Sequence, residues 1–154
     1  MDKLEELENK IKELSDEIEK LKAEKENEPW KPKCGDNYWA ISHTGYVVRV
    51  RWMDDDVEDD MYAIGNVFRT NEEAEFRAEQ LKVEAELRRF ARPFDEDERN
   101  WAIIFDVDEK KIIIDNECSY QSCNIHFASE EIAKKAIDTV GEDRIKKYYF
   151  EGEE

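Results

Sequence analysis

The segment LEELENKIKELSDEIEKLK, residues 4–22, decides the architecture of the first part of the chain. Its apolar residues recur at alternating spacings of three and four, which is a heptad repeat: Leu4, Leu7, Ile11, Leu14, Ile18 and Leu21. With Leu4 at position a, both isoleucines also fall at a and leucine fills every d position, a combination that favours parallel two-stranded coils. The pattern therefore predicts a dimeric coiled coil over residues 1–28, with these six residues in the dimer interface.

Charged residues beside the stripe agree with a parallel pair. Lys3 of one helix would face Glu8 of its partner, and Glu17 would face Lys22. The alternative is a single amphipathic helix that folds back onto its own domain. Three heptads are short for an isolated coil, so we expect the rest of the chain to contribute to the interface.

The pattern changes after residue 28. Pro29 and Pro32 remove amide donors and restrict the residues before them, so residues 29–37 are interpreted as a linker. Alternating apolar residues then predict a hairpin, followed by an acidic loop and a further strand: residues 38–41, 46–52, 54–60 and 62–68 in that order. Thr70 and Glu73 have the spacing of a capping box, which predicts a helix that runs to about Phe90 and is terminated by Pro93.

The second half repeats this order. Trp101-Ala102-Ile103 is similar to Trp39-Ala40-Ile41, and both halves then have a phenylalanine two residues before a helix-capping Ser or Thr. A hairpin over 103–115, a strand over 123–127 and a helix ending at Gly141 are expected. Chance similarity of two short segments is the alternative.

The predicted fold class is thus α+β. A duplicated ββ(β)α unit, residues 38–92 and 101–150, follows the coiled coil and forms one antiparallel sheet with helices on one face. An acidic linker, 93–100, separates the two copies, and an acidic tail covers 151–154. The helix after Thr70 has two apolar faces and should have two partners, the sheet and a second subunit.

Charge limits the classes of partner. The 154 residues have a formal net charge of −17, from 41 acidic and 24 basic residues, while 40% hydrophobic content is typical of a folded chain. Repulsion opposes direct binding to nucleic acid or to an anionic membrane, so a basic surface is the natural partner. No apolar run has the length of a membrane span, and the start lacks the apolar core of a signal peptide. We expect a cytoplasmic protein whose three cysteines are reduced.

Carboxylates gather between residues 54 and 60, and these are the expected partner-binding residues: Asp54, Asp55, Asp56, Glu58, Asp59 and Asp60. An EF-hand starting at Asp54 would need Gly and Glu where the chain has Asp59 and Gly65. Carboxylates held at intervals like those of DNA phosphates would attract the basic channel of a nucleic-acid enzyme. An acidic surface that only confers solubility is the alternative.

Catalysis has little support in the sequence. Zinc-ligand atoms are present in Cys118, Cys123 and His126, with Cys34 distant in sequence. These residues have no fourth ligand close by, and the strand pattern explains Cys123 more simply as a small core side chain. No nucleophile motif surrounds His43 or His126. No catalytic residue, metal or cofactor is predicted; a metal-dependent nuclease is retained as a third class only because of the aspartate clusters.

Two segments resemble small uncharacterised proteins of bacteriophages and prophages: residues 64–82, which contain Gly65-Asn66-Val67-Phe68 and Glu72-Glu73-Ala74-Glu75, and residues 140–149, Val-Gly-Glu-Asp-Arg-Ile-Lys-Lys-Tyr-Tyr. With Trp30-Lys31-Pro32 and Tyr38-Trp39, the likeness covers most of residues 30–150. Small acidic phage proteins are often inhibitors of host defence, including anti-CRISPR proteins that occupy the nucleic-acid channel of an effector nuclease.

The resemblance thus implies a dimeric inhibitor of a host nucleic-acid-targeting enzyme, acting as a DNA mimic in the bacterial cytoplasm. It assigns no catalytic residue. The alternative function is a phage adaptor or structural scaffold that binds through the coiled coil and the two-sided helix.

Overall fold

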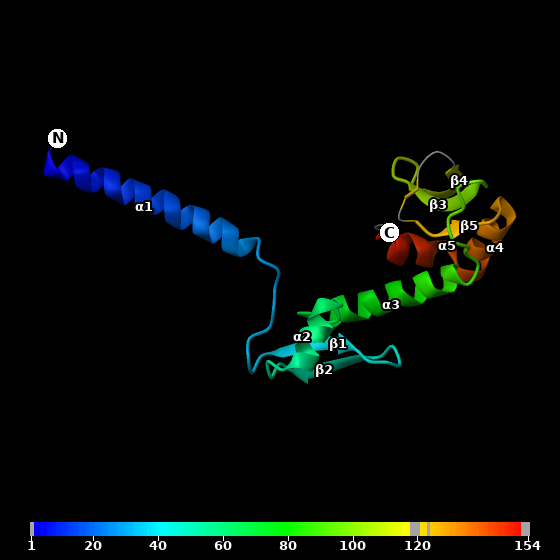
Figure 1. The fold of residues 1–154 in the computed structure, drawn as a ribbon, viewed down its shortest axis with the longest axis horizontal. Helices are drawn as coiled ribbons and strands as arrows, with labels where there is room; N and C mark the ends of the chain where they lie inside the picture. Colours follow the sequence, from blue (N-terminus) through cyan, green and yellow to red (C-terminus); the bar gives the residue numbers. More distant parts are fainter. Residues whose placement is uncertain (1, 118–120, 123, 152–154) are drawn as a thin grey trace.

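The structure is a computed structural model that describes residues 2–117, 121–122 and 124–151. It has an α+β fold in which a long N-terminal helix precedes two small antiparallel sheets and their helices (Figure 1). Across the described ranges, every helix is too short or too polar to cross a bilayer.

Helix α1, Lys3–Glu26, confirms the helix predicted from the heptad repeat. It begins where the backbone N–H of Asp2 donates to the Glu5 carboxylate at 3.4 Å. None of its residues is buried, and the six heptad residues are between 51% and 65% exposed. In Figure 1 this helix extends away from the rest of the chain. Pairing with a second copy stays a prediction.

The first hairpin is confirmed. Strands β1, Asn37–Ile41, and β2, Val47–Arg51, pair antiparallel with Trp39 opposite Arg49. Gly45, at φ 86°, supplies the left-handed residue that the turn requires. Trp52, the residue after β2, is fully buried and contacts the Tyr38 ring edge to face, with ring centroids 5.5 Å apart.

The acidic loop and the strand predicted over 62–68 are wrong. Residues 56–63 form helix α2, Asp56–Ala63, and only Phe68 takes part in strand-like pairing, as a bridge to Trp39. The helix forms because Asp55 caps it: the Asp55 carboxylate accepts from Glu58 N at 2.9 Å, and the Glu58 carboxylate accepts in turn from Asp55 N at 3.4 Å. This reciprocal arrangement is a capping box.

Helix α3, Asn71–Arg88, confirms the long helix, with Thr70 as its cap. Thr70 Oγ1 accepts from Glu73 N at 3.2 Å, but the Glu73 carboxylate accepts from Arg69 N and not from Thr70 N, so the predicted capping box is only half formed. The helix also ends before the expected Phe90. Pro93 lies beyond that end.

The second half has strands β3, Asn100–Asp106, β4, Lys111–Glu117, and β5, His126–Phe127, in the antiparallel order β4-β3-β5. Helix α4, Glu130–Val140, is capped by Ser129 and ends at Gly141, as predicted. A short helix α5, Glu142–Arg144, continues into a π-helix, Ile145–Tyr149, which we call η1.

The single antiparallel sheet is a second wrong prediction, because the strands of the described residues form two sheets. Helix α3 lies between the two groups: it packs against β1 and β2 and also against α4 and η1 (Figure 1). Its Val83 and Leu87 belong to the larger core, with Ile103 and Phe127. The helix therefore has two sets of partners within the same chain, and the predicted contact with a second subunit stays a prediction.

The segments that resemble each other in sequence occupy corresponding places. Trp39 pairs antiparallel with Phe68 just before α3, and Trp101 pairs antiparallel with Phe127 just before α4. In both cases the next element is a helix capped by a hydroxyl side chain.

The segment predicted as an acidic linker, 93–100, is organised by its last residue. Asn100 is fully buried; its side-chain oxygen accepts from Arg92 and from Asp95 N, each at 2.9 Å, and its amide donates to Asp95 O at 2.8 Å. The start of β3 is thereby fixed to the chain that precedes it.

Candidate functional site

One of the six carboxylates expected to bind a partner is in the interior. Glu58 is 5% exposed, and its carboxylate accepts from Met53 N at 2.7 Å as well as from Asp55 N. A carboxylate in that position stabilises the turn into α2, because it satisfies backbone donors that the fold removes from water. Assigning Glu58 to a contact surface is therefore wrong.

Three more of these residues are exposed but have partners within the chain. Asp54, at φ 62°, accepts from the Trp52 indole at 3.3 Å, and Asp55 caps α2. Asp59 forms an ion pair with Lys31 at 2.9 Å. The Lys31 ammonium also lies over the rings of Trp52 and Tyr62, at 5.4 and 5.2 Å from the centroids. This part of the acidic segment contributes to the fold.

Asp56 and Asp60 are the other two. Both are exposed on α2, and neither side chain has a hydrogen bond or an ion pair to any described residue. Their charge is available to a partner. Among the described residues, no group of three or more His, Cys, Asp or Glu side chains is placed to hold a metal ion.

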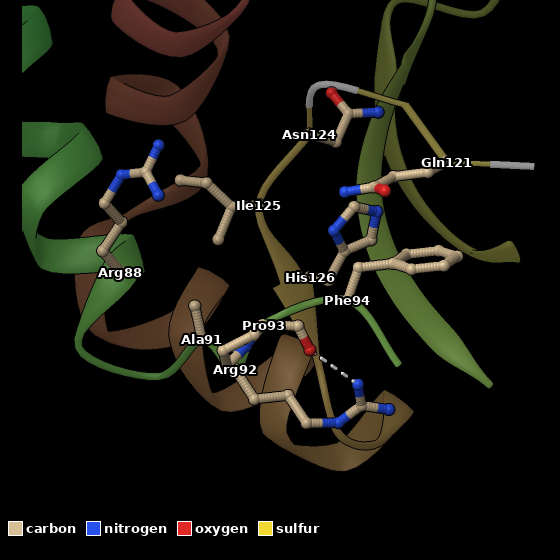
Figure 2. A pocket seen from close by; sticks show the side chains of 9 residues that line it. All are labelled: Arg88, Ala91, Arg92, Pro93, Phe94, Gln121, Asn124, Ile125 and His126. Carbon is tan, nitrogen blue, oxygen red and sulfur yellow. Dashed lines mark hydrogen bonds between the residues drawn. The ribbon is translucent and has the colours of Figure 1, made fainter. Parts of the chain in front are cut away.

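A cavity of about 450 Å³ lies between the chain that leaves α3 and the segment that leads into β5 (Figure 2). Its two arginines already have partners within the chain. Arg88 donates through Nε to Glu84 at 2.9 Å, while Arg92 donates to Pro93 O at 3.0 Å and to Asn100. Figure 2 shows the Arg92 guanidinium turned toward Pro93 rather than toward the His126 ring. Both guanidinium groups thus donate to groups of the chain itself and contribute to the fold.

His126, beside this cavity, belongs to a network that the sequence analysis missed. His126 is 5% exposed, and its Nε2 lies 2.7 Å from Oε2 of Glu117, whose Oε1 accepts from the Ser122 hydroxyl at 2.7 Å. The carboxylate stands between the hydroxyl and the imidazole. In a nucleophilic triad the imidazole stands in the middle, where it can take the hydroxyl proton. The order found here holds β4 to β5 and does not activate Ser122.

The pKa of Glu117 depends on the hydrogen bonds of this network. Burial acts to raise the pKa of the Glu117 carboxyl, but the hydrogen bonds from His126 and Ser122 outweigh it and hold the pKa below its usual value. The two residues are nine positions apart and on different strands, so no local motif indicates the pair.

The zinc alternative involves the same histidine. Cys118 and Cys123 lie outside the described residues, and Cys34 is exposed with a free thiol. The His126 Nε2 faces Glu117.

A second groove, of about 550 Å³, lies between the hairpin tip, α3 and η1. Aromatic side chains from the three elements line it, together with glutamates and lysines of α3 and η1: Tyr46, Phe76, Tyr148, Glu72, Glu75, Glu79, Lys82 and Lys147. Sequence reasoning missed this groove because its residues are up to about a hundred positions apart, a separation that no periodicity detects.

Comparison with known proteins finds no matching family model, no similar curated protein and no solved structure of similar fold.

Proposed function

We propose that this chain is a non-catalytic acidic binding protein that acts as a dimer on the basic nucleic-acid-binding surface of another protein. The observation that carries the proposal is the apolar stripe of α1, whose six residues are at least half exposed. A contiguous exposed apolar stripe of this size is typical of an interaction surface. A second copy with the same heptad pattern would bury it.

The charge of the chain supports a basic partner. Each copy has a formal net charge of −17, so a dimer would double the attraction for a surface of lysine and arginine. Asp56 and Asp60 provide carboxylates without intramolecular partners on one short helix. The resemblance to phage proteins extends the proposal to a host enzyme that targets nucleic acid, such as a CRISPR effector nuclease, in the bacterial cytoplasm.

A second candidate function, a phage adaptor or scaffold, is favoured by a different observation. Asp54, Asp55, Glu58 and Asp59 all have partners within the chain, so most of the acidic segment has a structural reason to be present. Helix α3 packs against both groups of elements inside the chain, and this candidate therefore depends chiefly on α1.

We also infer that residues 38–92 and 101–150 descend from one ββ(β)α unit. The matching Trp39–Phe68 and Trp101–Phe127 pairs support this, because each fixes a strand against the residue that leads into the following helix. The inference concerns the origin of the fold and does not alter the function proposed.

The test uses charge reversal where the fold does not need the carboxylates. Tagged wild-type chain and an Asp56→Lys/Asp60→Lys variant are used to capture protein from nuclease-treated host lysate, with elution by a salt gradient. A matched variant, Glu96→Lys/Glu98→Lys, changes the same number of exposed charges elsewhere. We expect a basic nucleic-acid-binding enzyme to be captured by the wild type, released at moderate salt because exposed charges are screened, and lost from the α2 variant.

The scaffold candidate predicts another result. Capture would resist salt and survive both charge reversals, but would be lost when Ile11→Asp or Leu14→Asp places a charge in the stripe. Equal loss with both charge-reversed variants would mean that net charge, and not the α2 surface, attracts the partner.

A further inference from the structure

The groove between the hairpin tip, α3 and η1 combines aromatic faces with carboxylates. Tyr46 follows Gly45 at the tip of the hairpin and is 76% exposed. Phe76 of α3 and Tyr148 of η1 lie with ring centroids 5.3 Å apart at a tilt of 48°. A wide groove that is open to solvent gains little binding free energy from an apolar ligand alone. Its charged side chains therefore determine which class of ligand it would bind.

Two of the carboxylates that line the groove have no intramolecular cation. Glu79 is paired with Lys82 at 2.5 Å, but Glu72 and Glu75 are exposed and form no ion pair or hydrogen bond with the described residues. Residues three and four apart lie on one face of a helix, so these carboxylates follow the wall of the groove beside Phe76. Unpaired carboxylates next to aromatic faces attract organic cations.

The chain already places a cation on one of these rings. The Lys147 ammonium lies 5.4 Å from the centroid of Tyr148, within the range of a cation–π contact. Lys147 is exposed and has a long side chain, and it forms no ion pair with a described carboxylate. Because both residues line the groove, an external cation on the Tyr148 ring would compete with Lys147.

The π-helix η1 carries Lys147 and Tyr148 and so positions one wall of the groove. Residues 145–149 are wound as η1, with Ile145 buried in the larger core. Such turns are rare and occur frequently at functional sites. The ion pair between Arg144 and Glu86 fixes the start of this turn to α3.

We propose that this groove binds the guanidinium group of an arginine on the partner protein, packed against the aromatic wall of Tyr46, Phe76 and Tyr148 and paired with the carboxylates of Glu72 and Glu75. The proposal deepens the proposed function and rests on it, because the arginine would belong to the basic surface that the acidic protein covers. Arginine fits better than lysine: its planar, weakly hydrated guanidinium stacks on aromatic faces and donates to carboxylates from a rigid fork.

The test measures binding of a fluorescent nine-residue peptide of alternating arginine and glycine to the full chain, by anisotropy. Lysine and citrulline versions of the peptide, and the free polyamine spermidine as competitor, separate recognition of guanidinium from attraction of any cation. We expect the arginine peptide to bind several-fold more tightly than the lysine peptide. Tyr46→Leu should weaken it by roughly fivefold and Lys147→Met should tighten it by about twofold to threefold, which are the sizes of exposed cation–π contacts.

A matched pair of variants separates the groove from general charge. Glu72→Gln/Glu75→Gln and Asp56→Asn/Asp60→Asn each remove two exposed carboxylates, but only the first pair lines the groove. Loss of peptide binding with the groove pair and retention with the α2 pair support the proposal. Equal effects of the two pairs, or equal binding of arginine and lysine peptides with no effect of Tyr46→Leu, overturn it.

Failure here and failure of the proposed function give different results. If the partner is still captured by Tyr46→Leu and Glu72→Gln/Glu75→Gln at wild-type salt resistance, the groove proposal is wrong and the acidic binding function stands. If no basic protein is captured by the wild type, the function fails, and the peptide titration still decides whether the groove takes a guanidinium group.

Discussion

Arg144 and Glu86 form a two-point ion pair that joins the C-terminal helices to α3. The two terminal nitrogens of Arg144 donate to the two carboxylate oxygens of Glu86 at 2.9 and 3.0 Å. Hydrogen bonding to Arg144 holds the pKa of the Glu86 carboxyl below its usual value of 4.5, although partial burial acts in the opposite direction. This pair stabilises the packing of η1 against α3, the helix that connects the two halves.

Glu86→Gln should destabilise the chain by about 1 kcal/mol at neutral pH, a value between those of exposed pairs and of charge-assisted hydrogen bonds. The folded pKa is the lower one, so the contribution of the pair is full above the unfolded value and is lost as the pH falls through the folded value. Urea unfolding at pH 7 and pH 3 should therefore show a difference between variant and wild type that shrinks in acid. Glu130→Gln, which breaks an exposed pair with Lys134, serves as the control and should change little. A difference that is constant with pH would contradict the assignment.

Glu58→Ala should destabilise the first half by about 2 kcal/mol, because it leaves the amides of Met53 and Asp55 without their acceptor. Chemical denaturation followed by tryptophan fluorescence reports the change, since Trp52 is buried beside this turn. Asp56→Ala, on the exposed side of the same helix, is the control and should cost about 0.5 kcal/mol through the helix dipole alone. Equal losses for the two variants would show that Glu58 has no special role.

His126→Leu should cost about 2 to 3 kcal/mol, because Glu117 loses a hydrogen bond while its side chain, which is 12% exposed, stays largely buried. The pKa of Glu117 should rise, since burial would then be opposed by Ser122 alone. Because the folded pKa is depressed in the wild type, the stability that Glu117 contributes is present above the ordinary carboxyl value and disappears as the pH falls through the depressed one. An NMR titration of the Glu117 side-chain carbon measures both values directly, and an unchanged pKa in the variant would disprove the coupling.

Periodicity and caps made the long elements predictable. The heptads of α1, the Thr70 cap of α3, and the Ser129 and Gly141 ends of α4 are local signals, and each helix appears where they indicate. The first hairpin follows from alternating apolar residues and the second from two apolar runs, each pair joined by a short polar turn. These features depend on neighbours within a few residues, which the sequence displays.

Other features depend on contacts that the sequence does not display. The density of carboxylates over residues 54–60 favours a loop, but Asp55 followed by Glu58 is also a capping signal, and the structure follows that signal by forming helix α2. The separation into two sheets follows from the length and position of α3, which keeps the hairpins apart. The Glu117–His126 contact and the groove at Tyr148 join distant residues, and only the folded chain brings them together.

Ile11→Asp or Leu14→Asp should convert a dimer into a monomer without unfolding residues 29–151, because α1 buries none of its residues against its own chain. In a paired coil each of these side chains would be enclosed by the partner helix, and an unpaired carboxylate there costs more than the short interface provides. Sedimentation equilibrium gives the mass of each variant, and tryptophan fluorescence, to which the buried Trp52 contributes, shows whether the first half is folded. Asn9→Asp, which adds one negative charge at the outer f position of the same heptad, is the matched control and should remain a dimer. A wild-type chain that sediments as a monomer at every concentration would contradict the dimer and leave the exposed stripe to a different partner protein.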